Sequence, residues 1–152
     1  MNDSYEMESP AEILMGYCRA MQNRDIDSCV TLKAFQLEAQ TIFENRAKKH
    51  PNEVITPDLV QQLVDILEAG YRQERQSNGS QDLSDASFSV IGTELLSSER
   101  AIVTQRTTWL DGAIIDERVM LGKTKDGWRV MQAWKPEPNH QIQTIAAKRG
   151  SV

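Results

Sequence analysis

Arg106 and Glu117 are the two side chains of this chain best suited to do chemistry together. They lie on either side of the dipeptide Asp111-Gly112. Arg106 directly precedes the stretch TTWLDGAIIDERVMLGKTKDGWRV, which runs from Thr107 to Val130, and Glu117 lies within it. A carboxylate in apolar surroundings can act as a general base, and an arginine beside it can hold an anionic or enolic group. The same pair also fits an ordinary cross-strand salt bridge, because a neighbouring arginine makes a carboxylate a weaker base.

Other reactive residue types are few and poorly placed for catalysis. Cys18 and Cys29 fall within helical apolar patterns, which indicates buried, reduced thiols. His50 precedes a proline and His140 lies in a polar C-terminal segment, so no Cys and His spacing predicts a zinc site. We therefore expect no metal and no cofactor. Whether the protein is an enzyme stays open, with these residues arguing against it more than for it.

Composition excludes several classes of function. The chain has 152 residues, 39% hydrophobic and 26% charged, which is typical of one globular domain. A net charge of -5 with dispersed basic residues argues against nucleic acid as a partner. We see neither a signal peptide nor an apolar run of about 18 residues, so we expect a cytoplasmic protein without membrane contact.

Helix signals fill the first half of the chain. Ser9-Pro10-Ala11-Glu12 is a capping box with proline at the first helical position, and an apolar stripe follows it as far as Asn23. Asp25 is a plausible cap for a short second helix. The helical pattern continues from Thr31 to Lys49, as one helix or two, and Thr56-Pro57-Asp58 begins a long helix that ends near Gln76.

A polar turn cluster, Ser77-Asn78-Gly79-Ser80, marks the change from helices to strands. Four expected strands follow it: Ala86 to Leu96, Arg100 to Leu110, Ala113 to Lys123 and Trp128 to Trp134. Their short connections require an antiparallel meander, so we predict an α+β fold with the helices on one face of a curved four-stranded sheet. The domain is expected over residues 10–135, between a flexible start (1–9) and a loose tail (136–152).

The dipeptide Asp111-Gly112 suggests a register for the central hairpin. A two-residue type I′ turn there pairs Leu110 with Ala113, which places Arg106 opposite Glu117. The face that carries this pair is the more apolar one and is predicted to pack on the helices. Its residues are Ile102, Thr104, Arg106 and Thr108 opposite Leu121, Val119, Glu117 and Ile115. Trp109, Ile114 and Met120 would form an apolar strip on the other face, a surface suited to a dimer interface.

The order of these elements resembles the nuclear transport factor 2-like superfamily, a cystatin-like α+β cone. The fragment NRDID between the first two helices and the closing KTKDGWRVMQAW are the pieces that carry this resemblance, which spans about Pro10 to Trp134. It implies a concave sheet wrapped around helices, a pocket at the open end and frequent dimers across the sheet. The isomerases of this fold use a tyrosine on a strand, whereas Tyr5, Tyr17 and Tyr71 all lie outside the expected strands.

Together these patterns favour a non-catalytic module, dimeric through its sheet, that binds a small apolar ligand or a protein partner. The expected ligand pocket consists of Arg106, Glu117, Thr104, Thr108 and Trp128. One alternative is a lyase or isomerase that acts on a small hydrophobic substrate with Glu117 as the base. Another is an accessory domain of a membrane or secretion assembly, although members with that role usually follow a membrane anchor.

Overall fold

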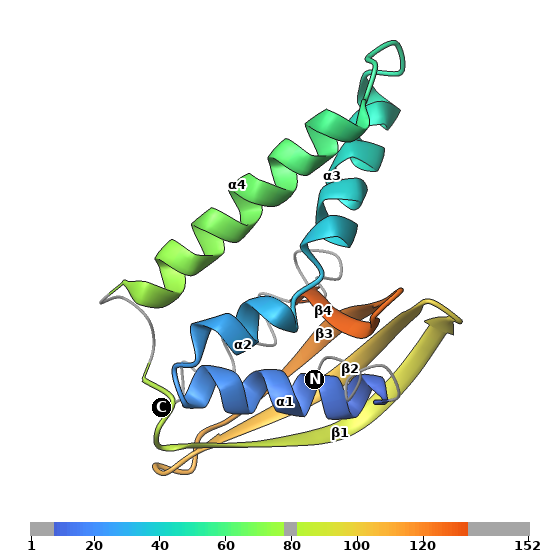
Figure 1. The fold of residues 1–152 in the computed structure, drawn as a ribbon. Coiled ribbons are helices and arrows are strands. Elements are labelled where there is room, and N and C mark those ends of the chain that lie inside the picture. The colour runs from blue at the N-terminus through green and yellow to red at the C-terminus, as the bar shows by residue number, and fades with distance from the viewer. Residues whose placement is uncertain (1–7, 78–81, 134–152) are drawn as a thin grey trace.

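A computed structural model describes residues 8–77 and 82–133, in which four helices precede a four-stranded sheet (Figure 1). The helices are α1 (Pro10–Gln22), α2 (Ile26–Thr31), α3 (Phe35–Lys49) and α4 (Pro57–Gln76). The strands are β1 (Ala86–Ser97), β2 (Arg100–Trp109), β3 (Ile114–Thr124) and β4 (Gly127–Ala133). They pair antiparallel in the order β1-β2-β3-β4, so the predicted α+β fold and meander are confirmed.

Some expected segments lie outside the described residues. These are the chain start before residue 8, residues 78–81, which hold all of the turn cluster except Ser77, and everything from residue 134, which includes the expected end of the last strand and the tail. The domain limits of 10 and 135 stay predictions. No helix in the described part of the chain is both long enough and apolar enough to cross a membrane.

The helix start signals act as the sequence predicts. The Ser9 hydroxyl accepts from the Glu12 amide at 3.2 Å, and the Glu12 carboxylate accepts from the Ser9 amide at 2.9 Å, which closes the capping box of α1. Asp25 caps α2 through the Ser28 amide, and Thr56 caps α4 through the Leu59 amide. Each contact satisfies a backbone donor that a helix leaves unpaired at its start.

A short non-helical segment separates α2 from α3. The helical pattern in the sequence does not show whether this region forms one helix or two. The segment from Leu32 to Ala34 runs beside β4: the Val130 amide donates to the Leu32 carbonyl, and the Ala34 amide donates to the Val130 carbonyl, both at 2.8 Å. These bonds cover the outer edge of β4. They also direct α3 away from the sheet, as Figure 1 shows.

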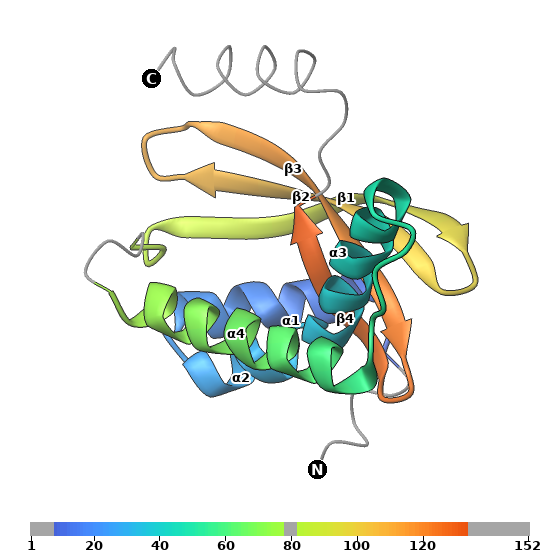
Figure 2. The same ribbon diagram turned by 90° about the horizontal axis from the view of Figure 1, so that it is seen from above.

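The core lies between α1 and the sheet. Figure 2 shows α1 against the strands, with α2 on its other side and α4 passing in front of both helices. Buried residues of α1 meet the inner face of the central strands and of β4. This core consists of Ile13, Leu14, Cys18, Leu32, Ala101, Val103, Val119, Leu121, Trp128 and Val130.

The predicted register of the β2–β3 hairpin is wrong by one residue. Arg106 pairs with Asp116, and Glu117 pairs with Gln105. The connection has three residues, Leu110 to Gly112, because the Trp109 amide bonds to the Ala113 carbonyl at 2.9 Å. Gly112 has a φ of 90°, the conformation that a three-residue hairpin loop places at its last position.

The shift also exchanges the predicted faces of β2, since the odd-numbered residues now face the helices. The inner face carries Ala101, Val103, Gln105, Thr107 and Trp109 beside Leu121, Val119, Glu117 and Ile115. The physical reason is charge burial: the predicted inner face of this hairpin would hold two charges, Arg106 and Glu117, whereas the observed one holds Glu117 alone. The extra loop residue, Leu110, is 82% exposed and makes this register reachable.

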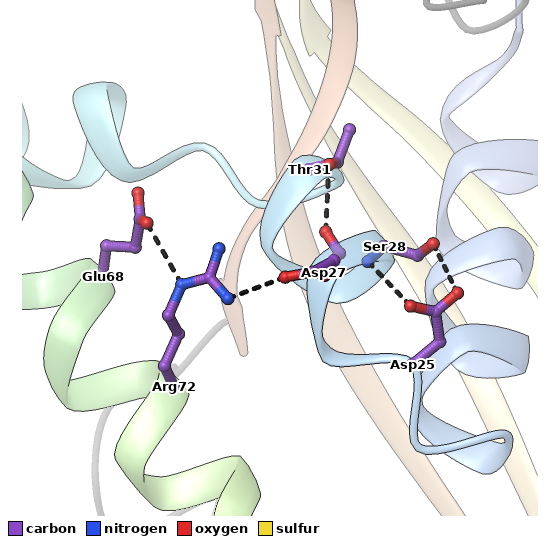
Figure 3. A network of polar contacts seen from close by, with 6 residues as sticks. All are labelled: Asp25, Asp27, Ser28, Thr31, Glu68 and Arg72. Atoms are coloured by element: carbon purple, nitrogen blue, oxygen red, sulfur yellow. Dashed lines mark hydrogen bonds and ion pairs between the residues drawn. The ribbon is translucent and has the colours of Figure 1, made fainter.

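The α3–α4 hairpin projects from the rest of the domain (Figure 1). α4 is amphipathic yet has no buried residue, and Ile66 in its middle is 66% exposed. The second half of α4 carries the contacts that attach this helix to the rest of the domain. Figure 3 shows Arg72 of α4 bonded to Asp27 of α2 at 2.8 Å and to Glu68 one turn earlier at 3.2 Å.

Candidate functional site

Arg106 does not meet Glu117. Its guanidinium forms a two-point salt bridge with Asp116, with Nε–Oδ1 at 2.9 Å and Nη2–Oδ2 at 3.1 Å. This pair lies on the outer face of the sheet, on the side away from α1, together with Thr104 and Thr108. The predicted grouping of Arg106, Thr104 and Thr108 with Glu117 is therefore wrong, because the one-residue shift separates the outer three from Glu117.

Trp128 and Trp109 also lie elsewhere than predicted. Trp128 is 7% exposed and belongs to the core, with the Lys123 ammonium 5.8 Å from its ring. Trp109 faces the helices rather than the outside, so it does not share a strip with Ile114 and Met120. Those two residues do lie on the outer face, and their role in a dimer stays a prediction.

The structure instead brings Glu117 and Trp109 to one hollow. It has a volume of about 210 Å³ and opens between α1, the end of α4 and the inner face of the sheet. Its lining residues are Met21, Arg75, Leu83, Phe88, Gln105, Thr107, Trp109, Ile115 and Glu117. We call this space the mouth hollow.

Apolar side chains form slightly more than half of the walls of the mouth hollow. Trp109 and Ile115 come from the ends of β2 and β3 beside the three-residue loop, and Phe88 comes from β1. Met21 adds a thioether from α1, and Arg75 Nη1 approaches its sulfur at 3.5 Å. A concave, largely apolar site with a few polar groups is the usual form of a small-molecule site.

A chain of hydrogen bonds forms the polar floor of the mouth hollow. The Cys18 thiol donates to Gln105 Oε1, and Gln105 Nε2 donates to Thr107 Oγ1, both at 3.2 Å. Burial raises the pKa of Cys18 to about 12, and the negative charge of Glu117 adds to this effect. The thiol is therefore protonated at neutral pH, so it is a hydrogen-bond donor and a poor nucleophile.

Two tyrosines that no sequence signal connects meet behind the mouth hollow. The hydroxyl oxygens of Tyr17 on α1 and Tyr71 on α4 lie 2.6 Å apart, one helical turn before Met21 and Arg75 respectively. Burial raises the pKa of Tyr17 to about 12 and raises that of Tyr71 as well. With such pKa values both phenols are neutral at physiological pH.

The Tyr71 ring has further partners. Phe35 meets it edge to face at 5.7 Å between ring centroids. The Lys33 ammonium and the Arg75 guanidinium lie 5.5 and 5.6 Å from its centroid. These contacts hold the end of α4, and hence Arg75, against the body of the domain.

Two larger depressions lie elsewhere on the described residues. One of about 520 Å³ lies between the start of α3 and the β3–β4 turn, where Lys125 and Asp126 contribute opposite charges. The other, about 450 Å³, lies on the α3–α4 hairpin around Phe43 and Val60. Within the described ranges no group of three or more His, Cys, Asp or Glu side chains could hold a metal ion.

Comparison with known proteins gives a structural similarity and no sequence match. No family model matches the sequence, and no curated protein matches it. The chain is similar to the crystal structure of an NTF-2 like protein of unknown function from Shewanella oneidensis MR-1. The two are 13% identical with a TM-score of 0.40, over 79% of this chain and 90% of that one.

Proposed function

We propose that this protein is a non-catalytic module that binds a small, mostly apolar ligand in the mouth hollow. The observation that carries the proposal is the pairing of an apolar wall around Trp109 with a buried polar floor at Gln105 and Thr107. Within the described ranges no histidine lines the hollow, and the Cys18 thiol beneath it is protonated and engaged. Binding without chemistry is the function that these side chains serve best.

The test is a titration of ¹⁵N-labelled protein with a panel of compact cyclic compounds. We expect the indole N–H signal of Trp109 to shift in a saturable way, while that of the core residue Trp128 stays in place. Ile115→Phe fills the hollow and should abolish the shift, whereas Ile114→Phe adds the same bulk to the outer face and should not. Equal binding by both variants would show that the ligand lies elsewhere.

We also propose that the chain dimerises through the outer face of the sheet. Ile114 is exposed there and Met120 is half-buried, which supports this part of the proposal. Light scattering would measure the mass of the wild type and of Ile114→Glu. A concentrated wild-type sample that remains monomeric would refute the dimer without touching the ligand site.

The second candidate is a lyase or isomerase with Glu117 as the base. Its support is that Glu117 lines the mouth hollow at a distance from Arg106, which is bonded to Asp116 instead. Exchange of the α-protons of cyclic ketones in D₂O, followed by NMR, tests it. An enzyme would exchange them faster with the wild type and with Asp116→Asn than with Glu117→Gln; equal rates would remove Glu117 from any mechanism.

A further inference from the structure

The hydrogen bonds in the floor of the mouth hollow run in one direction, because each bond fixes which group donates in the next. The Cys18 thiol donates to the carbonyl oxygen of the Gln105 amide, which turns the amide nitrogen toward Thr107. The nitrogen then donates to Thr107 Oγ1. The Thr107 hydroxyl is therefore an acceptor within the protein, and its own hydrogen remains to be donated.

Two donors are left over at this floor. One is the Thr107 hydroxyl, and the other is the second N–H of the Gln105 amide, since one of its two hydrogens already serves Thr107. The residues are 7% and 6% exposed, and both line the hollow. In the described part of the chain we find no acceptor for either hydrogen. A buried hydrogen that is not donated lowers stability, so such a site favours an acceptor from outside.

We infer that the mouth hollow is specific for small cyclic ligands that carry a carbonyl oxygen, which accepts hydrogen bonds from Thr107 and Gln105. This inference rests on the proposed ligand binding and adds its selectivity. The ring of the ligand packs on Trp109, Phe88 and Ile115. A hydrocarbon of the same shape would leave both donors unpaired, and a site built to bond a polar group rejects the analogue that lacks it.

Charge favours a neutral carbonyl over a carboxylate. Two charged side chains line the hollow, Arg75 and Glu117, and they have opposite signs. Arg75 is already placed over the Tyr71 ring and against the Met21 sulfur. Glu117 is exposed beside the hollow and repels an anion, so the net field gives a carboxylate ligand no advantage.

The experiment measures the affinity of 1-indanone, indane and indane-1-carboxylate, three probes of similar ring shape, by NMR titration. For the wild type we expect 1-indanone to bind about tenfold more tightly than indane, which corresponds to about 1.4 kcal/mol of hydrogen bonding. Thr107→Val should reduce this preference to less than about threefold with little change for indane. Thr107→Ser restores the hydroxyl and should restore the preference, and Thr108→Val on the outer face should leave it intact.

The outcomes separate the two proposals. Equal binding of 1-indanone and indane by the wild type would overturn the carbonyl specificity and leave ligand binding in place. A preference that survives in Thr107→Val would also overturn it, since the hydroxyl would then have no part. Tighter binding of the carboxylate would refute the choice of a neutral ligand. Absence of binding by all three probes would refute both proposals.

Discussion

The hydroxyl oxygens of Tyr17 and Tyr71 lie 2.6 Å apart, although 54 residues separate them in the chain. This contact joins α1, which is part of the core, to α4, which has no buried residue. The tyrosine pair thus ties a peripheral helix to the body of the domain, next to the wall that Arg75 gives the mouth hollow.

Removing one hydroxyl of this pair should loosen α4. Tyr71→Phe leaves the Tyr17 hydroxyl without its partner, so we expect a loss of about 1 kcal/mol in the free energy of unfolding and faster amide hydrogen exchange in α4. Tyr17→Phe should have a similar effect, and the double variant should cost about as much as either single one. Additive losses would mean that the two hydroxyls are not coupled.

Alkaline pH should destabilise the protein through its buried thiol and phenols. Burial raises the pKa of Cys18 from 9.0 to about 12 and that of Tyr17 from 10.0 to about 12. Because the folded state holds these protons more tightly than the unfolded state, their contribution is complete below about pH 9 and is lost as the pH rises toward about 12. Urea unfolding at about pH 8 and about pH 10.5 measures the loss. Cys18→Ala should show a smaller difference between the two pH values than the wild type, and an identical difference would contradict this origin.

Two glycines should respond to alanine in opposite directions. A Cβ at Gly122 would overlap Leu37 Cδ1 and lie 3.0 Å from the Met131 sulfur, so Gly122→Ala should destabilise the fold by about 1 to 3 kcal/mol. Gly70 lies inside α4, where an alanine methyl would meet no other described part of the chain within 4 Å, so Gly70→Ala should stabilise by up to about 1 kcal/mol. Urea unfolding measures the change in the free energy of unfolding for both variants. If Gly122→Ala leaves this free energy unchanged, the Leu37 side chain can move aside.

The outer salt bridge should matter little for stability and not at all for binding. The Arg106 side chain is 40% exposed, and pairs of this kind contribute about 0 to 1 kcal/mol. Asp116→Asn should therefore lower the free energy of unfolding by no more than about 1 kcal/mol and leave ligand titrations unchanged. A large effect on binding would place Asp116 at the site and contradict the observed register.

Deleting Leu110 should preserve the register of the central hairpin. The deletion leaves Asp111-Gly112 as a two-residue loop between Trp109 and Ala113, which are already paired, and this dipeptide favours a type I′ turn. We expect NMR amide shifts to change near the loop only. Changes along the whole of β3 would mean that the strand had slipped, because a one-residue slip moves every side chain to the other face.

Local signals support the sequence-based predictions that hold, and long-range packing limits the rest. Ser9 and Thr56 indicate their helices because a cap bonds to an amide three residues away. Asp111-Gly112 is an equally local signal, yet the loop takes Leu110 as a third residue, so that Ala101 and Val103 of β2 reach the core and Arg106 stays on the outer face. The faces of the strands depend on that choice, and a turn dipeptide alone does not determine it.

The candidate site is the least predictable part for the same reason. Glu117 stands out in the sequence and does line the mouth hollow, whereas the two-residue turn puts its companions Gln105 and Thr107 on the opposite face. Tyr17 and Tyr71 carry no signal for a site, because neither lies on a strand. Only the packing of α4 on α1 brings them together, and no spacing along the chain encodes that contact.

The absence of buried residues in α4 bears on the rates of ligand entry and release. Detaching this helix would expose less apolar surface than unfolding the core, so its opening would depend less on denaturant and would precede unfolding of the core. Since Arg75 of α4 forms one side of the mouth hollow, that opening would also widen the way in. Dissociation would then be timed by helix motions on the microsecond to millisecond scale rather than by the slower unfolding of the sheet.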